Sequence, residues 1–579
     1  MRLRRSLAVA CVTAVVLYGI SSAWRLIIAQ ADSDSGVPRQ VMGGLETRMD
    51  ATGDDTPFTG DRPQDVERVG AGIDGVPLAL PNGKVMMLLT HGARGSQYLA
   101  ARFSTDNGRT WGESRKLFDF PANGGSFSNG PALVSKNGTI HVFGMEMYGF
   151  DFNDRQKSKC HLWHSRSRDG GRTWSAARKV DFGLNYTGAV NSAFQLRSGR
   201  IICPVSGLSD RRIGPWVSLA PYSDDDGATW HAPKQQITMN TGAPDWYESG
   251  AVEPVGIGLK DGRAWLLPRS QDGYQWESFS KDGGITWTPV RHTRFVNNQS
   301  AMALMRLADG RLILFWNNCG PEGVHGIYAE RLVMCAAISS NEGKTWRGYR
   351  EIARRTSPGE ISYPFITQTR DGYVLLATDG NLWRVRPDFL LNRDMTEDFS
   401  AGIRRWSTLA AKGVFAAPDP DGGKGRVLSM VKPDVGAPSA ACMSFPYGVR
   451  GDIAIQVRME PGFQGAHFTL SDHYDLPRLP RDGSFPIAIT PSGRVMIIAA
   501  GGAWVDTPGD LTAGKWHELR LRWNCGQGCA VLSLDRTEIA QMEQFVRTPG
   551  VCYLRLCSTA PTVDTAGLYI RSVKVRTSD

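Results

Sequence analysis

SRDGGRTW, from Ser167 to Trp174, is one of five octapeptides that decide the fold of this chain. All five fit the pattern S-x-[DN]-x-G-x-x-W, and the others begin at Ser104, Ser223, Ser280 and Ser339. Successive copies start 63, 56, 57 and 59 residues apart. That period is somewhat longer than the roughly 40–50 residues of the commoner propeller blades. The repeat therefore predicts a radial array of small antiparallel sheets.

A second repeat, out of phase with the first, sets the number of sheets. Six segments join two apolar runs through a turn that ends in Asn-Gly, Asp-Gly or Ser-Gly, which are hairpin signals because these residues tolerate positive φ. The six turn glycines are Gly83, Gly138, Gly199, Gly262, Gly310 and Gly372. Six hairpins with five octapeptides between them predict an all-β, six-bladed β-propeller. The octapeptides themselves are interpreted as structural turns, in which Asp or Asn bonds its own backbone and Trp packs between sheets.

Composition limits the functional classes. The chain has 579 residues, 41% of them hydrophobic, which is enough for two or three folded units. Its formal charge of +9 is dispersed, with no long run of Lys or Arg outside the N-terminus. This balance mildly favours an anionic ligand and does not predict nucleic-acid binding.

The N-terminus predicts export. Residues 1–31 join a basic start to an apolar run and end in the small-x-small sequence Ala29-Gln30-Ala31, so they are either a signal peptide or an N-terminal membrane anchor. The protein is then expected to be periplasmic, secreted or anchored on the outer side of a membrane. Residues 32–64 are polar and glycine-rich, as in a flexible linker.

The remaining chain divides into two predicted domains. The propeller is expected over 65–393, and 394–579 show alternating strands separated by Gly, Pro and Asp turns, which predicts a β-sandwich of jelly-roll type. TAGKWHELRLRW, within that sandwich, resembles concanavalin-like modules, which either bind glycans or pack as accessory domains. One or two disulfides are expected in this C-terminal region. No Cys and His pattern predicts a metal site, and no cofactor is expected.

Two side chains occupy matching positions in blades four and six. Glu253 lies nine residues before Gly262, and Tyr363 lies nine residues before Gly372. Arg269 follows Gly262 by seven residues. Because the innermost strands of a propeller converge on its axis, equal offsets predict that Glu253 and Tyr363 face one pocket at the same height.

These features together resemble the sialidase superfamily, also called BNR-repeat or Asp-box proteins, over about residues 65–393. The resemblance implies that Tyr363 is a nucleophile activated by Glu253 as general base. It also implies that Arg269 and Arg331 bind a substrate carboxylate. A neutral phenol suits this task, because an anomeric carbon that carries a carboxylate repels an anionic nucleophile.

The first blade departs from the family pattern. Residues 72–77 (GIDGVP) hold no arginine where the family has one, and the loop from Leu88 to Ser104 lacks the family's acid/base Asp. Asp74 and His91 are the candidates to donate the proton to the leaving group instead.

Three functions remain open on the sequence. The first is a sialidase-like exo-glycosidase that removes a terminal acidic sugar, either sialic acid or a uronic acid, from a glycan. The second is a lectin-like propeller that binds glycans without turnover, and the third is a surface interaction scaffold. Trp246, Tyr247 and Trp276 are candidate sugar-stacking residues, or else core residues.

Overall fold

The computed structural model describes residues 62, 64–72, 75–121, 124–149, 159–182, 189–208, 216–239, 250–270, 272–320, 331–354, 361–408, 411–475 and 483–579. These residues form β-strands and a short 3₁₀ helix, η3 (Pro387–Leu391). The predicted all-β class is therefore confirmed. Within the described part of the chain, no helix is long and apolar enough to cross a membrane. The predicted signal or anchor segment, 1–31, lies outside the described residues.

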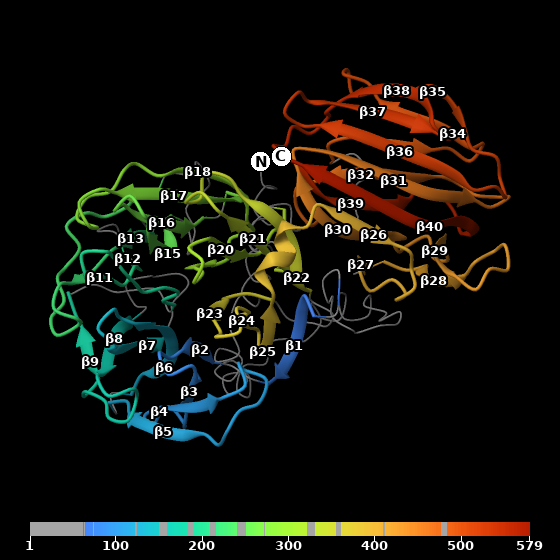
Figure 1. Cartoon of the computed structure of the whole chain (residues 1–579). Coiled ribbons are helices and arrows are strands. Elements are labelled where there is room, and N and C mark those ends of the chain that lie inside the picture. Colours follow the sequence, from blue (N-terminus) through green and yellow to red (C-terminus); the bar gives the residue numbers. More distant parts are fainter. Residues whose placement is uncertain are drawn as a thin grey trace, which may run out of the picture.

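Seven antiparallel sheets, which make up six blades, stand around a ring in the first part of the chain (Figure 1), which confirms the propeller. Blade one contains β2 (Val76–Ala79), β3 (Val85–His91), β4 (Tyr98–Ser104) and β5 (Arg115–Asp119). Blade two contains β6 (Ser126–Val134), β7 (Ile140–Gly149), β8 (Lys159–Ser167) and β9 (Arg178–Val180). Blade three is divided between β10 (Phe194–Gln195), β11 (Ile201–Ile202) and β14 (Tyr222–Ser223) on one side and β12 (Val205–Leu208) and β13 (Trp216–Leu219) on the other.

The later blades are regular. Blade four contains β15 (Val252–Gly258), β16 (Ala264–Arg269), β17 (Tyr274–Ser280) and β18 (Arg291–Val296). Blade five contains β19 (Ala303–Arg306), β20 (Leu312–Trp316), β21 (Val333–Ser339) and β22 (Arg347–Arg354). Blade six contains β23 (Phe365–Gln368), β24 (Val374–Thr378) and β25 (Asn381–Val385), and β1 (Val66–Ala71) completes it as the fourth strand.

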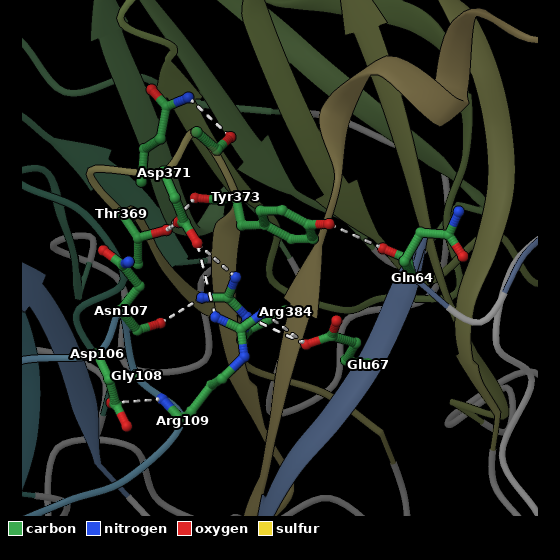
Figure 2. Close-up of polar contacts among 12 residues, drawn as sticks. Gln64, Glu67, Asp106, Asn107, Gly108, Arg109, Thr369, Asp371, Tyr373 and Arg384 are labelled. Carbon is green, nitrogen blue, oxygen red and sulfur yellow. Dashed lines mark hydrogen bonds and ion pairs between the residues drawn. The ribbon is translucent and has the colours of Figure 1, made fainter.

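The pairing of β1 with β25 closes the ring, and a buried arginine reinforces the closure (Figure 2). Arg384 donates hydrogen bonds to Asp371 Oδ2 at 2.8 Å and to Glu67 Oε2 at 3.3 Å. Its guanidinium lies over the ring of Tyr373 and also reaches the carbonyl of Asn107 in the first octapeptide. Residues from both ends of the propeller therefore meet at one side chain.

The octapeptides are hydrogen-bonded turns. In the first copy the Ser104 hydroxyl accepts from the Gly108 N–H at 2.8 Å, and the Thr110 hydroxyl donates to Asp106 at 2.6 Å. The Thr110 hydroxyl and backbone N–H hold the pKa of Asp106 well below its usual value. In every copy the serine is the last residue of the strand that precedes the turn, which is β4, β8, β14, β17 or β21. The turns therefore lie at the opposite end of their sheets from the second-to-third strand connections.

The C-terminal part is a sandwich of two large sheets, whose shared core is apolar. One sheet contains β28 (Val414–Pro418), β29 (Arg426–Lys432), β40 (Asp564–Ser578), β31 (Arg450–Met459), β36 (His517–Asn524), β37 (Cys529–Leu534) and β38 (Thr537–Glu543), with β26 (Asp394–Glu397) beside β40. The other contains β27 (Trp406–Ser407), β30 (Ala440–Gly448), β39 (Val551–Ser558), β32 (Ala466–Ser471), β33 (Ile487–Ile489), β34 (Arg494–Ile498) and β35 (Trp504–Asp510).

The sandwich packs on blades four and five of the propeller (Figure 1). Tyr349 of β22 stacks on Tyr447 of β30 with ring centroids 4.3 Å apart. The nine described cysteines are all free thiols, so the disulfides expected in the C-terminal region are absent from this structure. Cys442 and Cys552 are instead buried in the apolar contact between the two domains, as small hydrophobic residues.

Candidate active site

Three of the predicted site residues meet at one point. Glu253 lies in β15, Arg269 ends β16, and Tyr363 lies two residues before β23. The Tyr363 hydroxyl is 3.2 Å from Glu253 Oε1 and 3.0 Å from Arg269 Nη1, while Arg269 Nη1 also pairs with Glu253 Oε2. Glu253 and Arg269 are buried and Tyr363 is half-buried, so the phenol is the accessible member of the group.

Arg331 lies on the other side of the tyrosine. Its guanidinium carbon is 5.3 Å from the centroid of the Tyr363 ring, and its Nη2 donates to the carbonyl of Gln299 at 3.0 Å. Its own carbonyl accepts from the Ile361 N–H at 2.9 Å, two residues before Tyr363. Blades four, five and six therefore each contribute a side chain to one buried cluster.

The backbone at this cluster is strained. Glu253, Gln299 and Tyr363 have φ of 46°, 59° and 51°, a region that side chains other than Gly, Asn and Asp rarely adopt. Glu253 is the second residue of β15, and Gln299 and Tyr363 lie just before β19 and β23, so the three residues lie near the starts of the first strands of three consecutive blades. Such strain persists only where surrounding contacts hold it, and it concentrates at functional sites. Here one such contact is the hydrogen bond from the Glu253 N–H to the Ser206 hydroxyl.

The hydrogen-bond directions define what the cluster can do. A carboxylate is an acceptor only and a guanidinium is a donor only. The Tyr363 hydroxyl therefore donates to Glu253 and accepts from Arg269. Glu253 can take the phenolic proton, and Arg269 can stabilise the oxygen anion that this transfer leaves. The arrangement is that of a nucleophile with its base and an orienting cation.

The structure does not bring every predicted residue to this cluster. His91, at the end of β3, lies 3.3 Å from the Ser114 hydroxyl and packs against the Tyr98 ring in a tilted arrangement, and both partners are in its own blade. Trp276 donates to Asp272 at 2.8 Å and meets the His292 ring edge-on, with ring centroids 4.3 Å apart. These contacts lie within blade four. Asp74, Trp246 and Tyr247 lie outside the described residues.

The segment of the first blade that lacks the family's arginine is also sterically crowded at Gly75, the residue after Asp74. A Cβ atom at Gly75 would lie 2.6 Å from the carbonyl oxygen of Leu88 and 2.9 Å from side-chain atoms of Met87 and Leu89. Position 75 therefore has no room for a side chain, and it cannot hold an arginine in place of the missing one. Among the described residues, no group of three or more His, Cys, Asp and Glu side chains could hold a metal ion.

Sequence reasoning missed Asp379, an exposed carboxylate at the same end of blade six. Asp379 and Gly380 form the turn between β24 and β25, both with positive φ, as a two-residue hairpin turn requires. The Thr378 hydroxyl, at the end of β24, donates to the carbonyl of Ser362 at 2.7 Å, so the residues directly before Asp379 and Tyr363 are in contact. The signal was present in the spacing, because Asp379 follows Gly372 by seven residues, as Arg269 follows Gly262.

Comparisons with known proteins agree with this architecture. A family model described as a BNR repeat-like domain matches residues 101–376. A sialidase of Micromonospora viridifaciens is 29% identical over 324 residues, covering 50% of this chain and 46% of that protein. A sialidase of Bacteroides fragilis (strain YCH46) is 25% identical over 263 residues, covering 40% and 45% respectively. The chain thus spans about half the length of the curated relatives it matches.

Two sialidases are among the solved structures that match this chain. Trypanosoma rangeli sialidase matches with a TM-score of 0.39 and 12% identity, covering 88% of this chain and 92% of that one. The Hadza microbial sialidase Hz136 matches with a TM-score of 0.43 and 18% identity, covering 58% and 69%.

Proposed function

We infer that the chain belongs to the sialidase (BNR-repeat) superfamily, and we propose that it is an exo-glycosidase that removes a terminal acidic sugar from a glycan. The observation that carries the proposal is the triangle of Tyr363, Glu253 and Arg269, in which a half-buried phenol is hydrogen-bonded to a buried carboxylate and a buried guanidinium. Sialic acid is the first substrate to test, since both curated relatives are named sialidases.

In the proposed reaction Tyr363 is the nucleophile. Its hydroxyl transfers a proton to Glu253 as its oxygen bonds to the anomeric carbon, and the glycosidic bond breaks with protonation of the leaving oxygen. Water then attacks the anomeric carbon of the glycosyl–tyrosine and gives its proton to the residue that protonated the leaving oxygen, while the bond to Tyr363 oxygen breaks and the phenol regains its proton from Glu253. Two displacements at one carbon give net retention of configuration.

Arg269 and Arg331 are proposed to select an acidic sugar. Their guanidinium groups flank the Tyr363 ring and hydroxyl, so a carboxylate on the anomeric carbon would lie between two cations. Arginine suits this task because its planar fork of donors matches a carboxylate and stays charged at every physiological pH.

The leaving group needs a proton donor, for which the chain offers three candidates. His91 and Asp74 were expected from the sequence, and Asp379 is the carboxylate that the hairpin turn of blade six adds. We assign the donor to Asp379, since it is exposed and follows Thr378, whose hydroxyl donates to the carbonyl of the residue before Tyr363, whereas the described contacts of His91 lie within the first blade.

The test is hydrolysis of an aryl α-sialoside and a panel of aryl uronides by the chain from Asp32 onward, which contains every described residue. Turnover that is lost in Tyr363→Phe supports the proposed nucleophile. Turnover of uronides alone would keep the mechanism and change the sugar. The proposal also assigns an exported location, which rests on residues 1–31 alone.

A second candidate function is carbohydrate binding without turnover. It is favoured by the absence of an arginine from residues 72–77 and of an aspartate from residues 88–104. Saturable binding of sialic acid together with no turnover of any aryl glycoside would favour this function over hydrolysis.

A further inference from the structure

Two consecutive asparagines lie between the active-site cluster and the C-terminal sandwich. Asn317 and Asn318 follow β20 directly, at the end of blade five that also carries Arg331. Both side chains are buried, with 0% and 1% exposure. A buried amide group is retained at little cost only where its donors and acceptor are satisfied, so the partners of these two residues matter.

Asn317 bonds to three segments that surround the cluster. Its Nδ2 donates to the carbonyl of Val333 at 2.7 Å and to the carbonyl of Ile361 at 2.6 Å, and its Oδ1 accepts from the Ser300 hydroxyl. Both N–H groups and the oxygen are therefore engaged.

Each of those partners is close in sequence to a site residue. Ile361 lies two residues before Tyr363, and its N–H donates to the Arg331 carbonyl at 2.9 Å. Val333 lies two residues after Arg331, and Ser300 follows Gln299, whose carbonyl binds the Arg331 guanidinium. Asn317 therefore fixes the backbone on both sides of the pair formed by Arg331 and Tyr363.

Asn318 bonds in the opposite direction, to the sandwich. Its Nδ2 donates to the carbonyl of Asp472 at 2.9 Å, and its carbonyl accepts from the Tyr474 N–H at 2.8 Å. The Gly320 N–H then donates to the Tyr474 carbonyl at 3.0 Å, and Cys319 pairs with Tyr474 as a short parallel bridge. Backbone bonds of this kind hold the 472–474 loop of the sandwich at a fixed position on blade five.

We propose that Asn317 and Asn318 are a positioning pair through which the C-terminal sandwich holds Arg331 and Tyr363 in their reactive geometry. This inference rests on the proposed hydrolase function. The peptide that joins the two residues is planar and of fixed length, so a displacement of Asn318 moves Asn317 with it. A misplacement of about 1 Å at a reacting group can cost about 10²-fold in rate. The sandwich is then part of the catalytic unit.

The test compares Asn317→Ala and Asn318→Ala with Arg347→Ala in the full chain. Arg347 is the matched control because its ion pair with Asp579 also joins propeller to sandwich, but it is solvent-exposed and begins β22. The first readout is kcat and KM on an aryl α-sialoside. The second is hydrogen–deuterium exchange of the peptide spanning 361–368, which needs no turnover.

We expect kcat to fall about 10²-fold in Asn317→Ala and roughly tenfold in Asn318→Ala, with a smaller change in KM and no change in the control. The 361–368 peptide should exchange faster in both asparagine variants. If Asn317→Ala does not fold, Asn318→Ala still decides, since its lost contacts are all on the sandwich side. Wild-type kcat and exchange in Asn318→Ala would overturn the inference. A wild-type chain without turnover would instead refute the proposed function, and the exchange readout would still test the coupling.

Discussion

Tyr363 and Glu253 are 110 residues apart in sequence, and the hydroxyl of one lies 3.2 Å from the carboxylate of the other. Both have positive φ near the start of an innermost strand, and both lie nine residues before a hairpin glycine. The contact therefore follows from the repeat itself. The blades are arranged around one axis, so residues at equivalent positions of their innermost strands line the same central pocket.

Glu253→Gln should lose most of the activity while the chain stays folded. The amide keeps the size of the side chain and can bond to Tyr363, but it cannot accept the phenolic proton. We expect kcat to fall about 10²–10⁴-fold, the usual range for a general base, and the acidic limb of the pH–rate profile to disappear. Glu113→Gln, at an exposed position, is the control. An unchanged pH profile in Glu253→Gln would refute its role as base.

Arg331→Ala should impair binding of acidic sugars selectively. Charge-assisted hydrogen bonds contribute about 1.5–3 kcal/mol each, so KM for an aryl α-sialoside should rise roughly 10–150-fold. The methyl ester of the same sialoside has no carboxylate and should show little difference between variant and wild type. Arg291→Ala, which removes an exposed arginine, should change neither KM. Equal losses on acid and ester would mean that Arg331 acts on the fold instead.

Substrates whose leaving groups differ in basicity can identify the residue that donates the proton. Loss of a general acid slows substrates with basic leaving groups far more than those whose leaving group departs as a stable anion. Asp379→Asn should therefore reduce kcat/KM strongly on a methyl glycoside and weakly on a dinitrophenyl glycoside, whereas His91→Ala should reduce both little. The reverse pattern would return the assignment to His91.

The repeats predicted the parts of the fold that recur, and they missed the parts that occur once. The six hairpin glycines and five octapeptides set the blade count and placed Glu253 and Tyr363 at equal height. Nothing in the sequence indicated that β1 would complete blade six, because that pairing joins residues over 300 positions apart. The contact of Asn318 with Tyr474 was equally hidden, since it depends on how two domains meet. Asp379 was overlooked for another reason: an Asp-Gly pair is fully explained as a turn.

Arg384→Ala should weaken the closure of the ring. The substitution removes a fully buried cation from Asp371 and Glu67 and leaves a cavity beside Tyr373. We expect the free energy of unfolding in urea to fall by about 3 kcal/mol. Arg109→Ala acts on the same two carboxylates from an exposed position, so it should cost less than about 1 kcal/mol. Similar losses in the two variants would argue against burial as the source of the effect.

A buried histidine pair between blade two and the third octapeptide should make the propeller sensitive to acid. His141 Nε2 lies 3.1 Å from Asp226 Oδ1, and His141 Nδ1 lies 3.1 Å from His164 Nε2, with Arg166 close by. Burial, and then the nearby charges of His141 and Arg166, lower the pKa of His164 to about 3. Burial also lowers the pKa of His141, against the attraction of Asp226. Both rings are therefore neutral in the folded protein at pH 7.

The sign of the pH dependence follows from these directions. The unfolded chain binds a proton at His164 below its ordinary pKa of about 6.5, whereas the folded chain does not until about pH 3. Stability is thus complete above about pH 6.5 and is lost progressively as the pH falls toward 3. Between pH 7 and pH 5 this histidine alone should reduce the free energy of unfolding by about 2 kcal/mol.

His164→Gln keeps an N–H donor for His141 without a titrating group, so its melting temperature should fall less on acidification than that of the wild type. His292→Gln, at an exposed position, should leave the wild-type dependence intact. If His164→Gln loses as much stability as the wild type between pH 7 and pH 5, another group is responsible for the acid sensitivity.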